Sequence, residues 1–256
     1  MVKSKVAILA VLLLNLQGFT LYKKVMDKRF KEAPLESLVA AIQGIGIEMG
    51  RGKIAKTYFE KGAILFVDGA RIEDVRLALI LDRIRPIEAL KGVYLLNKLE
   101  KLLLRARGNT LGEKISESTS LMDRIIENTM DVPDFLTPAI KGLMEKFGPM
   151  FPEILEDILK QRLKDDPYLV AILWPDRFFE EMLKILGWTS VEQFILFLWM
   201  EVCSLYPRIP KKKREDVLRT LKNIQRKISI KDRKSIVIAW RDFLETIIDV
   251  IMNYAR

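Results

Sequence analysis

Apolar positions recur along this chain with two different periods, and the change between them divides it. From Val6 to about Arg107, short apolar runs alternate with two longer segments of helical period. Beyond Gly112 the period is helical throughout, with Pro and Gly between the segments. The sequence therefore predicts an α+β unit over residues 1–107 and an all-helical unit over residues 112–256.

The first apolar run predicts a buried strand. Val6–Leu14 is nine apolar residues long, whereas a bilayer-spanning helix needs about 20. Asn15–Gly18 is a plausible turn, and Phe19, Leu21 and Val25 then alternate with polar residues. We expect a hairpin whose first strand is central in a sheet covered on both faces. A signal anchor is the alternative, because Lys3 and Lys5 precede the run.

The next residues predict one helix, three strands and a second helix. Pro34 begins a helical pattern that ends near Gly50, and Pro86 begins another. Strand-like segments lie between them, at Lys53–Glu60, Ala63–Gly69 and Arg76–Asp82. We expect a five-stranded antiparallel meander sheet with helices packed against it.

This order of elements resembles the longin/roadblock superfamily, and more specifically longin domains. The stretches that carry the resemblance are "LLNLQGFTLYKKV", "PLESLVAAIQGIGIEMG", "KIAKTYFEKGAILFVDG" and "RLALILD". It covers about residues 6–107, in element order and hydrophobic pattern only; profilin-like and PAS-like sheets are alternatives. The C-terminal helical half resembles no family.

The resemblance implies a non-catalytic binding platform. Longin-like domains serve in complexes that regulate or recruit small GTPases and in trafficking and signalling adaptors, and roadblock relatives often dimerise. The expected partners are therefore a small GTPase, another longin/roadblock-like chain or a second copy of this chain. By this analogy, a protein interface is expected on the exposed face of the first helix and on the adjoining strand, at Glu36, Gln43, Glu48, Lys53 and Lys56.

The helical half is expected to contain several helices separated by Pro and Gly, one of them over residues 152–163. Ser190–Gln193 has the spacing of a capping box, which predicts that a new helix begins there. The segments Asp176–Leu186 and Ser190–Tyr206 are therefore expected to be two helices.

The positive charge is concentrated in one part of that half. Residues 208–234 contain twelve Lys and Arg against three Asp and Glu, so this segment alone accounts for the net charge of +9. It predicts a site for an anionic partner, which could be nucleic acid, an anionic membrane or an acidic protein surface. No aromatic residue lies between Tyr206 and Trp240, so base stacking is not indicated. The residues expected to bind are Lys211, Lys212, Lys213, Arg214, Arg219, Lys222, Arg226, Lys227, Lys231, Arg233 and Lys234.

Candidate catalytic groups are few. The chain has no histidine, and its one cysteine, Cys203, lies in an apolar segment. Asp165-Asp166 and Glu180-Glu181 are adjacent pairs, which on a helix point in different directions. Gly44–Lys53 lacks the spacing of a phosphate loop. We expect no cofactor and no metal.

The sequence thus favours a cytoplasmic, non-catalytic adaptor with a thermophile-like composition, and a peripheral position at a membrane is an alternative location. A nucleic-acid-binding protein that uses residues 211–234 is the alternative function. An enzyme would need a carboxylate or lysine site assembled at the junction of the two units.

Overall fold

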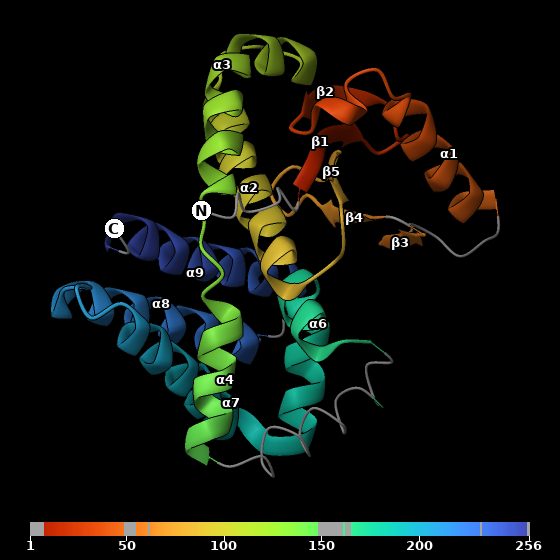
Figure 1. Cartoon of the computed structure of the whole chain (residues 1–256). Coiled ribbons are helices and arrows are strands. Elements are labelled where there is room, and N and C mark those ends of the chain that lie inside the picture. Colours follow the sequence, from red (N-terminus) through yellow and green to blue (C-terminus); the bar gives the residue numbers. More distant parts are fainter. Residues whose placement is uncertain are drawn as a thin grey trace. The chain divides into compact units, whose positions relative to one another are not determined.

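The computed structural model describes residues 8–48, 55–60, 62–147, 161, 165–230 and 232–254 (Figure 1). The chain divides into two compact units, Met1–Asp131 and Val132–Arg256. We call them the sheet unit and the helical unit. The division lies later than residues 107–112, where the sequence predicted it, because one helix beyond that point packs on the sheet unit.

The sheet unit contains five antiparallel strands in the order β2-β1-β5-β4-β3. Strands β3, β4 and β5 form a meander, and β5 then pairs with β1, so β1 lies between β5 and its hairpin partner. The predicted α+β class with a five-stranded antiparallel sheet is confirmed. The bounds are β1 Ile8–Asn15, β2 Thr20–Val25, a 3-10 turn Lys28–Phe30, α1 Leu35–Glu48, β3 Lys56–Phe59, β4 Gly62–Asp68, β5 Val75–Leu81, α2 Pro86–Arg105 and α3 Leu111–Met130.

The first apolar run forms the predicted hairpin. β1 pairs with β2 in a register that sets Val11 opposite Lys24. Gly18 has φ of 85°, which the turn requires and which glycine adopts without steric cost. Phe19 differs from the expected pattern: it lies in the turn before β2 begins, and its side chain is 68% exposed.

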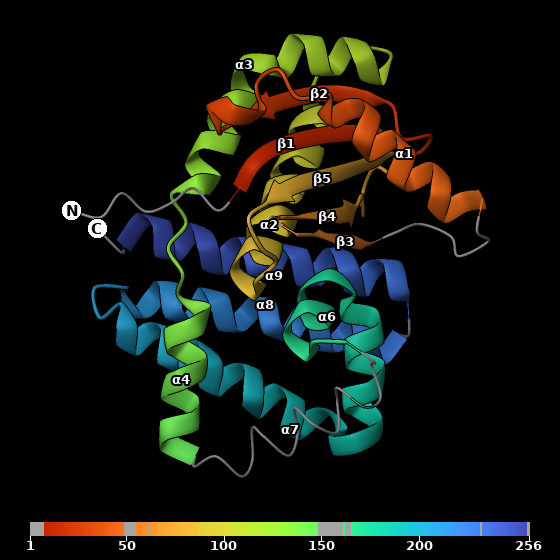
Figure 2. The same ribbon diagram turned by 45° about the vertical axis from the view of Figure 1, so that its right-hand side comes forward.

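Helices cover both faces of this sheet (Figure 2). Leu35, Val39 and Ile42 of α1 pack on a face that includes Leu12 of β1 and Ala78 of β5. Helix α2 packs on strands β4 and β5. Gly92 permits its close approach, because a Cβ atom there would lie 2.7 Å from Leu79 Cδ1. The central strands β1 and β5 can therefore be apolar on both sides.

Helix α3, the third helix of the sheet unit, is bound to the edge strand β2 by side-chain hydrogen bonds. It begins at a capping box formed by Thr110 and Glu113 and packs against α2. Tyr22 donates a hydrogen bond of 2.6 Å to Asp123 Oδ1, and Lys24 Nζ lies 2.8 Å from the same oxygen. Hydrogen bonds from Lys24 and Tyr22 hold the pKa of Asp123 below its usual range. The polar side of β2 is thus occupied by α3.

The turn between β4 and β5 is built around one buried carboxylate. Glu100 of α2 is fully buried, and its Oε1 accepts hydrogen bonds from the backbone N–H groups of Ala70, Arg71 and Ile72 at 2.8, 2.7 and 2.8 Å. Gly69 begins the turn, where a Cβ atom would lie 2.1 Å from Ile72 O. This acceptor satisfies the buried N–H group of Ala70 and the half-buried N–H groups of Arg71 and Ile72.

The helical unit is described by five helices within residues 132–147, 161, 165–230 and 232–254. Their bounds are α4 Leu136–Phe147, α6 Pro167–Leu173, α7 Pro175–Leu205, α8 Lys211–Ile230 and α9 Arg233–Tyr254. Helix α8 packs along α9, and α7 packs against each of the other four. Trp240 of α9 packs edge-on against Phe179 of α7, with ring centroids 5.1 Å apart.

The predicted break within α7 is wrong. The helix runs without interruption from Pro175 to Leu205, through Gly187 and through the expected cap at Ser190. An internal glycine costs only about 1 kcal/mol, and buried residues on both halves, such as Met182 and Trp199, outweigh that cost. Most of a helix predicted over residues 152–163 lies outside the described part of the chain.

We expect Glu100→Ala to destabilise the sheet unit by about 3 kcal/mol, because one buried and two half-buried N–H groups lose their acceptor. Amide hydrogen exchange measures this locally, since Ala70, Arg71 and Ile72 should lose protection first. Glu127→Gln, which removes a carboxylate that is 64% exposed, is the control and should cost under about 1 kcal/mol. Unchanged protection of these amides in Glu100→Ala would contradict the assigned role.

Candidate interaction surfaces

Helix α8 has one apolar side and one strongly basic side. Val217, Leu221 and Ile224 are almost fully buried. Because an α-helix turns about 100° per residue, five of the exposed cations project from the opposite side within an arc of about 100°. We call them the basic face of α8: Lys211, Lys212, Arg219, Lys222 and Arg226, all exposed.

The basic face is long and not uniformly positive. From Lys211 to Arg226 it extends about 22 Å along the helix axis. Glu215 is exposed within the same arc, and Asp216 lies beside it with its carboxylate 3.4 Å from Arg219 Nη1. The face therefore combines five cations with one carboxylate and has a second carboxylate at its border.

Arg214, which the sequence assigned to the anionic-partner site, has a structural role. Its Nε donates to Ile209 O at 2.9 Å and its Nη2 donates to Pro207 O at 3.0 Å. These bonds satisfy two carbonyls of the short turn between α7 and α8, and Ile209 itself is buried. The short Pro207–Pro210 segment could have indicated this structural role from the sequence, because its backbone carbonyls need hydrogen-bond donors.

Apart from Lys213, the remaining predicted cations that the structure describes lie around the turn from α8 to α9. Lys227 is half-buried, Arg233 Nη2 lies 3.5 Å from Glu180 Oε2, and Lys234 is exposed. Hydrogen bonds from Ser235, with smaller contributions that include Lys227, lower the pKa of Asp232. Lys231 lies outside the described residues. These cations do not belong to the stripe that runs along α8 from Lys211 to Arg226.

One residue of the predicted protein interface on α1 and β3, Gln43, does not lie on the exposed face of α1. Gln43 is only 7% exposed, because it faces the sheet and accepts a hydrogen bond from the buried Arg76. Glu36 is part of an ion pair with Lys23 Nζ at 2.5 Å. Lys56 is half-buried on β3. The side chain of Glu48 and all of Lys53 lie outside the described residues.

Arg76 is the residue that the sequence reasoning overlooked here. It is 3% exposed near the start of β5, its Nε lies 2.9 Å from Asp68 Oδ1, and its guanidinium lies 4.7 Å from the centre of the Phe66 ring. Burial lowers the pKa of Arg76, and the Asp68 carboxylate opposes that shift. An arginine in an apolar strand requires buried acceptors, and this requirement explains the position of Gln43.

Elsewhere on α1 and β3, several large apolar side chains are exposed to solvent. Leu38 of α1 is 41% exposed, and Tyr58 and Phe59 of the edge strand β3 are 61% and 44% exposed. Leu38 is thus an exposed apolar side chain on α1, and Tyr58 and Phe59 are exposed aromatic side chains on the edge strand β3.

The candidate catalytic groups have local structural roles. Asp166 caps α6 by accepting hydrogen bonds from the N–H groups of Tyr168 and Leu169. Glu180 and Glu181 both lie within 3.1 Å of Lys184 Nζ. Burial raises the pKa of the Cys203 thiol, which disfavours the thiolate. Within the described ranges no group of three metal-ligating side chains occurs.

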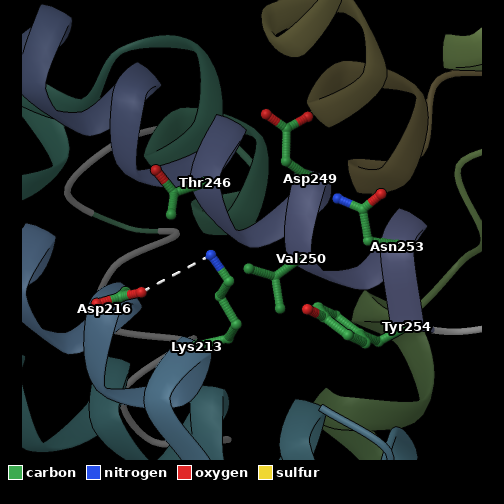
Figure 3. A pocket seen from close by; sticks show the side chains of 7 residues that line it. All are labelled: Lys213, Asp216, Thr246, Asp249, Val250, Asn253 and Tyr254. Atoms are coloured by element: carbon green, nitrogen blue, oxygen red, sulfur yellow. Dashed lines mark ion pairs between the residues drawn. The ribbon is translucent and has the colours of Figure 1, made fainter. Parts of the chain in front are cut away.

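A polar cleft lies between the start of α8 and the end of α9 (Figure 3). Its volume is about 420 Å³. On the α9 side the lining residues recur at helical spacing along one face. The cleft is lined by Lys213, Asp216, Thr246, Asp249, Val250, Asn253 and Tyr254.

None of the helices in the described ranges combines the length and hydropathy that crossing a bilayer requires. Comparisons of the chain with family models, curated proteins and solved structures yield no match.

Replacing Arg214 should separate its structural role from the role of its neighbours. We expect Arg214→Ala to lower the free energy of unfolding by about 2 kcal/mol, because two carbonyls lose a charged donor. Lys212→Ala, two residues away on the basic face, should change it by less than about 0.5 kcal/mol. Urea unfolding of the two variants is the measurement, and equal effects would contradict the assignment.

Proposed function

We propose that this chain is a non-catalytic adaptor whose helical unit binds an acidic protein surface through the basic face of α8. The observation that carries the proposal is the placement of five exposed cations on one side of a helix whose other side is buried. Helix α8 is held in place by its apolar side, so the cations are presented without folding of the helix on binding. Presenting a fixed charge pattern favours rapid and specific docking of a complementary surface.

The charge pattern favours a protein over a polyanion. Glu215 lies within the basic arc and Asp216 at its border, where a nucleic acid or an anionic bilayer would repel both. A folded protein can present a cation opposite such a carboxylate. Among the described residues, the large exposed apolar side chains include none from α8, so this face offers no side chain for bilayer insertion.

The sheet unit is proposed to supply the second attachment that an adaptor needs. Its order of elements, β1-β2-α1-β3-β4-β5-α2, supports the resemblance to longin/roadblock domains. Exposed Leu38, Tyr58 and Phe59 are suitable for contact with a small GTPase, another longin-like chain or a second copy of this chain. We place the protein in the cytoplasm as part of this proposal, since a single buried cysteine needs no oxidising compartment.

Duplex nucleic acid is the second candidate partner, because the same five cations could contact phosphates along a stripe of about 22 Å. It predicts a steep loss of affinity with salt and a bound species that nuclease removes. Binding of an acidic protein is expected to show neither the steep loss of affinity with salt nor the loss of the bound species on nuclease treatment.

Zero-length carbodiimide cross-linking in nuclease-treated native lysate tests the proposal, because it joins lysine to carboxylate only where the two are in contact. We expect cross-links from Lys211, Lys212 or Lys222 to Asp or Glu of one protein. Lys222→Glu/Arg226→Glu should reduce its recovery at least tenfold, a change of about 1.4 kcal/mol.

The matched control is Lys114→Glu/Lys141→Glu, which changes the net charge equally on α3 and α4. It should leave recovery unchanged. Cross-links spread evenly over all lysines, or equal losses in both double variants, would contradict a specific role for the basic face.

A further inference from the structure

Glu215 lies inside the basic face of α8, and its side chain is exposed. Along the helix it lies four residues after Lys211 and four residues before Arg219, which is about 6 Å along the axis from each. Around the helix it lies about 40° from Lys211, within the arc of about 100° that the five cations occupy. A partner surface that covers both Lys211 and Arg219 therefore also covers the Glu215 carboxylate.

Among the residues that the structure describes, Glu215 forms no ion pair, although cations lie at helical spacing on both sides of it. Arg219, at the i+4 position where a glutamate usually finds a basic partner, lies 3.4 Å from Asp216 Oδ1 instead. Lys213 Nζ lies 3.9 Å from the other oxygen of the same carboxylate. The charge of Asp216 is thus compensated within the chain, whereas the charge of Glu215 is presented to solvent.

A partner that covers Glu215 displaces the water that solvates its carboxylate. A carboxylate that loses water without gaining a donor weakens a complex, and acidic groups placed against the five cations would also repel it. A uniformly acidic surface therefore fits the cations of the basic face but not the position of Glu215. A lysine or arginine at that position supplies both hydrogen-bond donors and the opposite charge.

We propose that Glu215 is a specificity-determining residue that contacts a lysine or arginine of the partner; the inference rests on the proposed function. The partner surface then has carboxylates opposite Lys211 and Arg219 and one cation between them. This alternation fixes how the two surfaces align. A shift of one helical turn along α8 would place the partner's cation against Lys211, Lys212 or Arg219, where it would be repelled.

The same carboxylate disfavours the second candidate partner. The backbone of a nucleic acid duplex presents phosphates and has no cation to place against Glu215, so the two negative charges repel each other. Glu215 therefore acts in opposite directions on the two candidate partners: it strengthens binding of the protein and weakens binding of the duplex.

Two binding measurements on Glu215→Gln test this assignment, because the replacement removes one negative charge with little change in size. Recovery of the partner by affinity capture from nuclease-treated lysate should fall about fivefold, because the partner's cation loses its carboxylate. The affinity of the full chain for a DNA duplex of about 20 base pairs should rise about threefold at about 0.1 M salt, because a repulsive charge is removed.

Glu32→Gln is the matched control, since it removes one exposed carboxylate from the sheet unit and should change neither value. Glu215→Asp keeps the charge and should retain the duplex affinity and most of the recovery. The urea unfolding midpoint of Glu215→Gln should equal that of the unmodified chain, because the exposed side chain is not needed for folding. A lower midpoint together with weaker binding of both partners would indicate a structural role and overturn the assignment.

Higher recovery of the partner in Glu215→Gln would also overturn the assignment, because a uniformly acidic partner gains when a negative charge is removed from the basic face. Unchanged recovery or unchanged duplex affinity would do the same. The proposed function fails by a different result, namely that Lys222→Glu/Arg226→Glu retains the partner. If that double variant loses the partner while Glu215→Gln keeps it, the assignment of Glu215 fails and the proposed function holds.

Discussion

The sheet unit depends on one constraint: its two central strands, β1 and β5, are apolar on both faces. All described residues from Ile8 to Leu14 are at most 3% exposed, and β5 is buried along its whole length. Such strands are stable only if both faces of the sheet are covered, which α1 and α2 do. With both faces covered, Leu38 on α1 and Tyr58 and Phe59 on the edge strand β3 are among the large apolar side chains that the sheet unit exposes.

Buried charged side chains also determine where other polar groups lie inside this unit. Arg76 and Glu100 are charged side chains within the apolar layers, and each is paired with groups from another element. Gln43 and the β4–β5 turn have their positions because of these two residues. Polar groups that a sequence reader assigns to the surface are here required by the core.

In the helical unit, the apolar side of α8 is the corresponding constraint. Burial of Val217, Leu221 and Ile224 fixes the rotation of the helix, and that rotation determines which cations reach solvent. Arg214 is turned toward the preceding loop and Lys213 toward α9, so both leave the stripe. Helical geometry thus separates the clustered cations: five form the basic face, Arg214 binds the loop before α8, and Lys213 lines the cleft.

Periodicity predicted most of the strands and helices of the sheet unit, because its buried segments are short and bounded by Pro and Gly. It did not predict the attachment of α3 to β2 or the continuity of α7, because both depend on packing between distant segments. For the basic segment, the sequence indicated where the charge lies. That Arg214 binds the preceding loop while Arg219 lies on the basic face follows only from the direction of each side chain in the fold. The composition of the segment does not contain that direction.

The central claim is that the basic face of α8 binds a protein and not a polyanion. The most direct measurement is affinity capture of the tagged chain from native lysate, with and without nuclease and over increasing salt, followed by analysis of bound protein and nucleic acid. The account predicts one protein retained after nuclease, with a charge-rich acidic surface and a moderate salt dependence. Nucleic acid as the bound species, lost with nuclease and steeply dependent on salt, would contradict it.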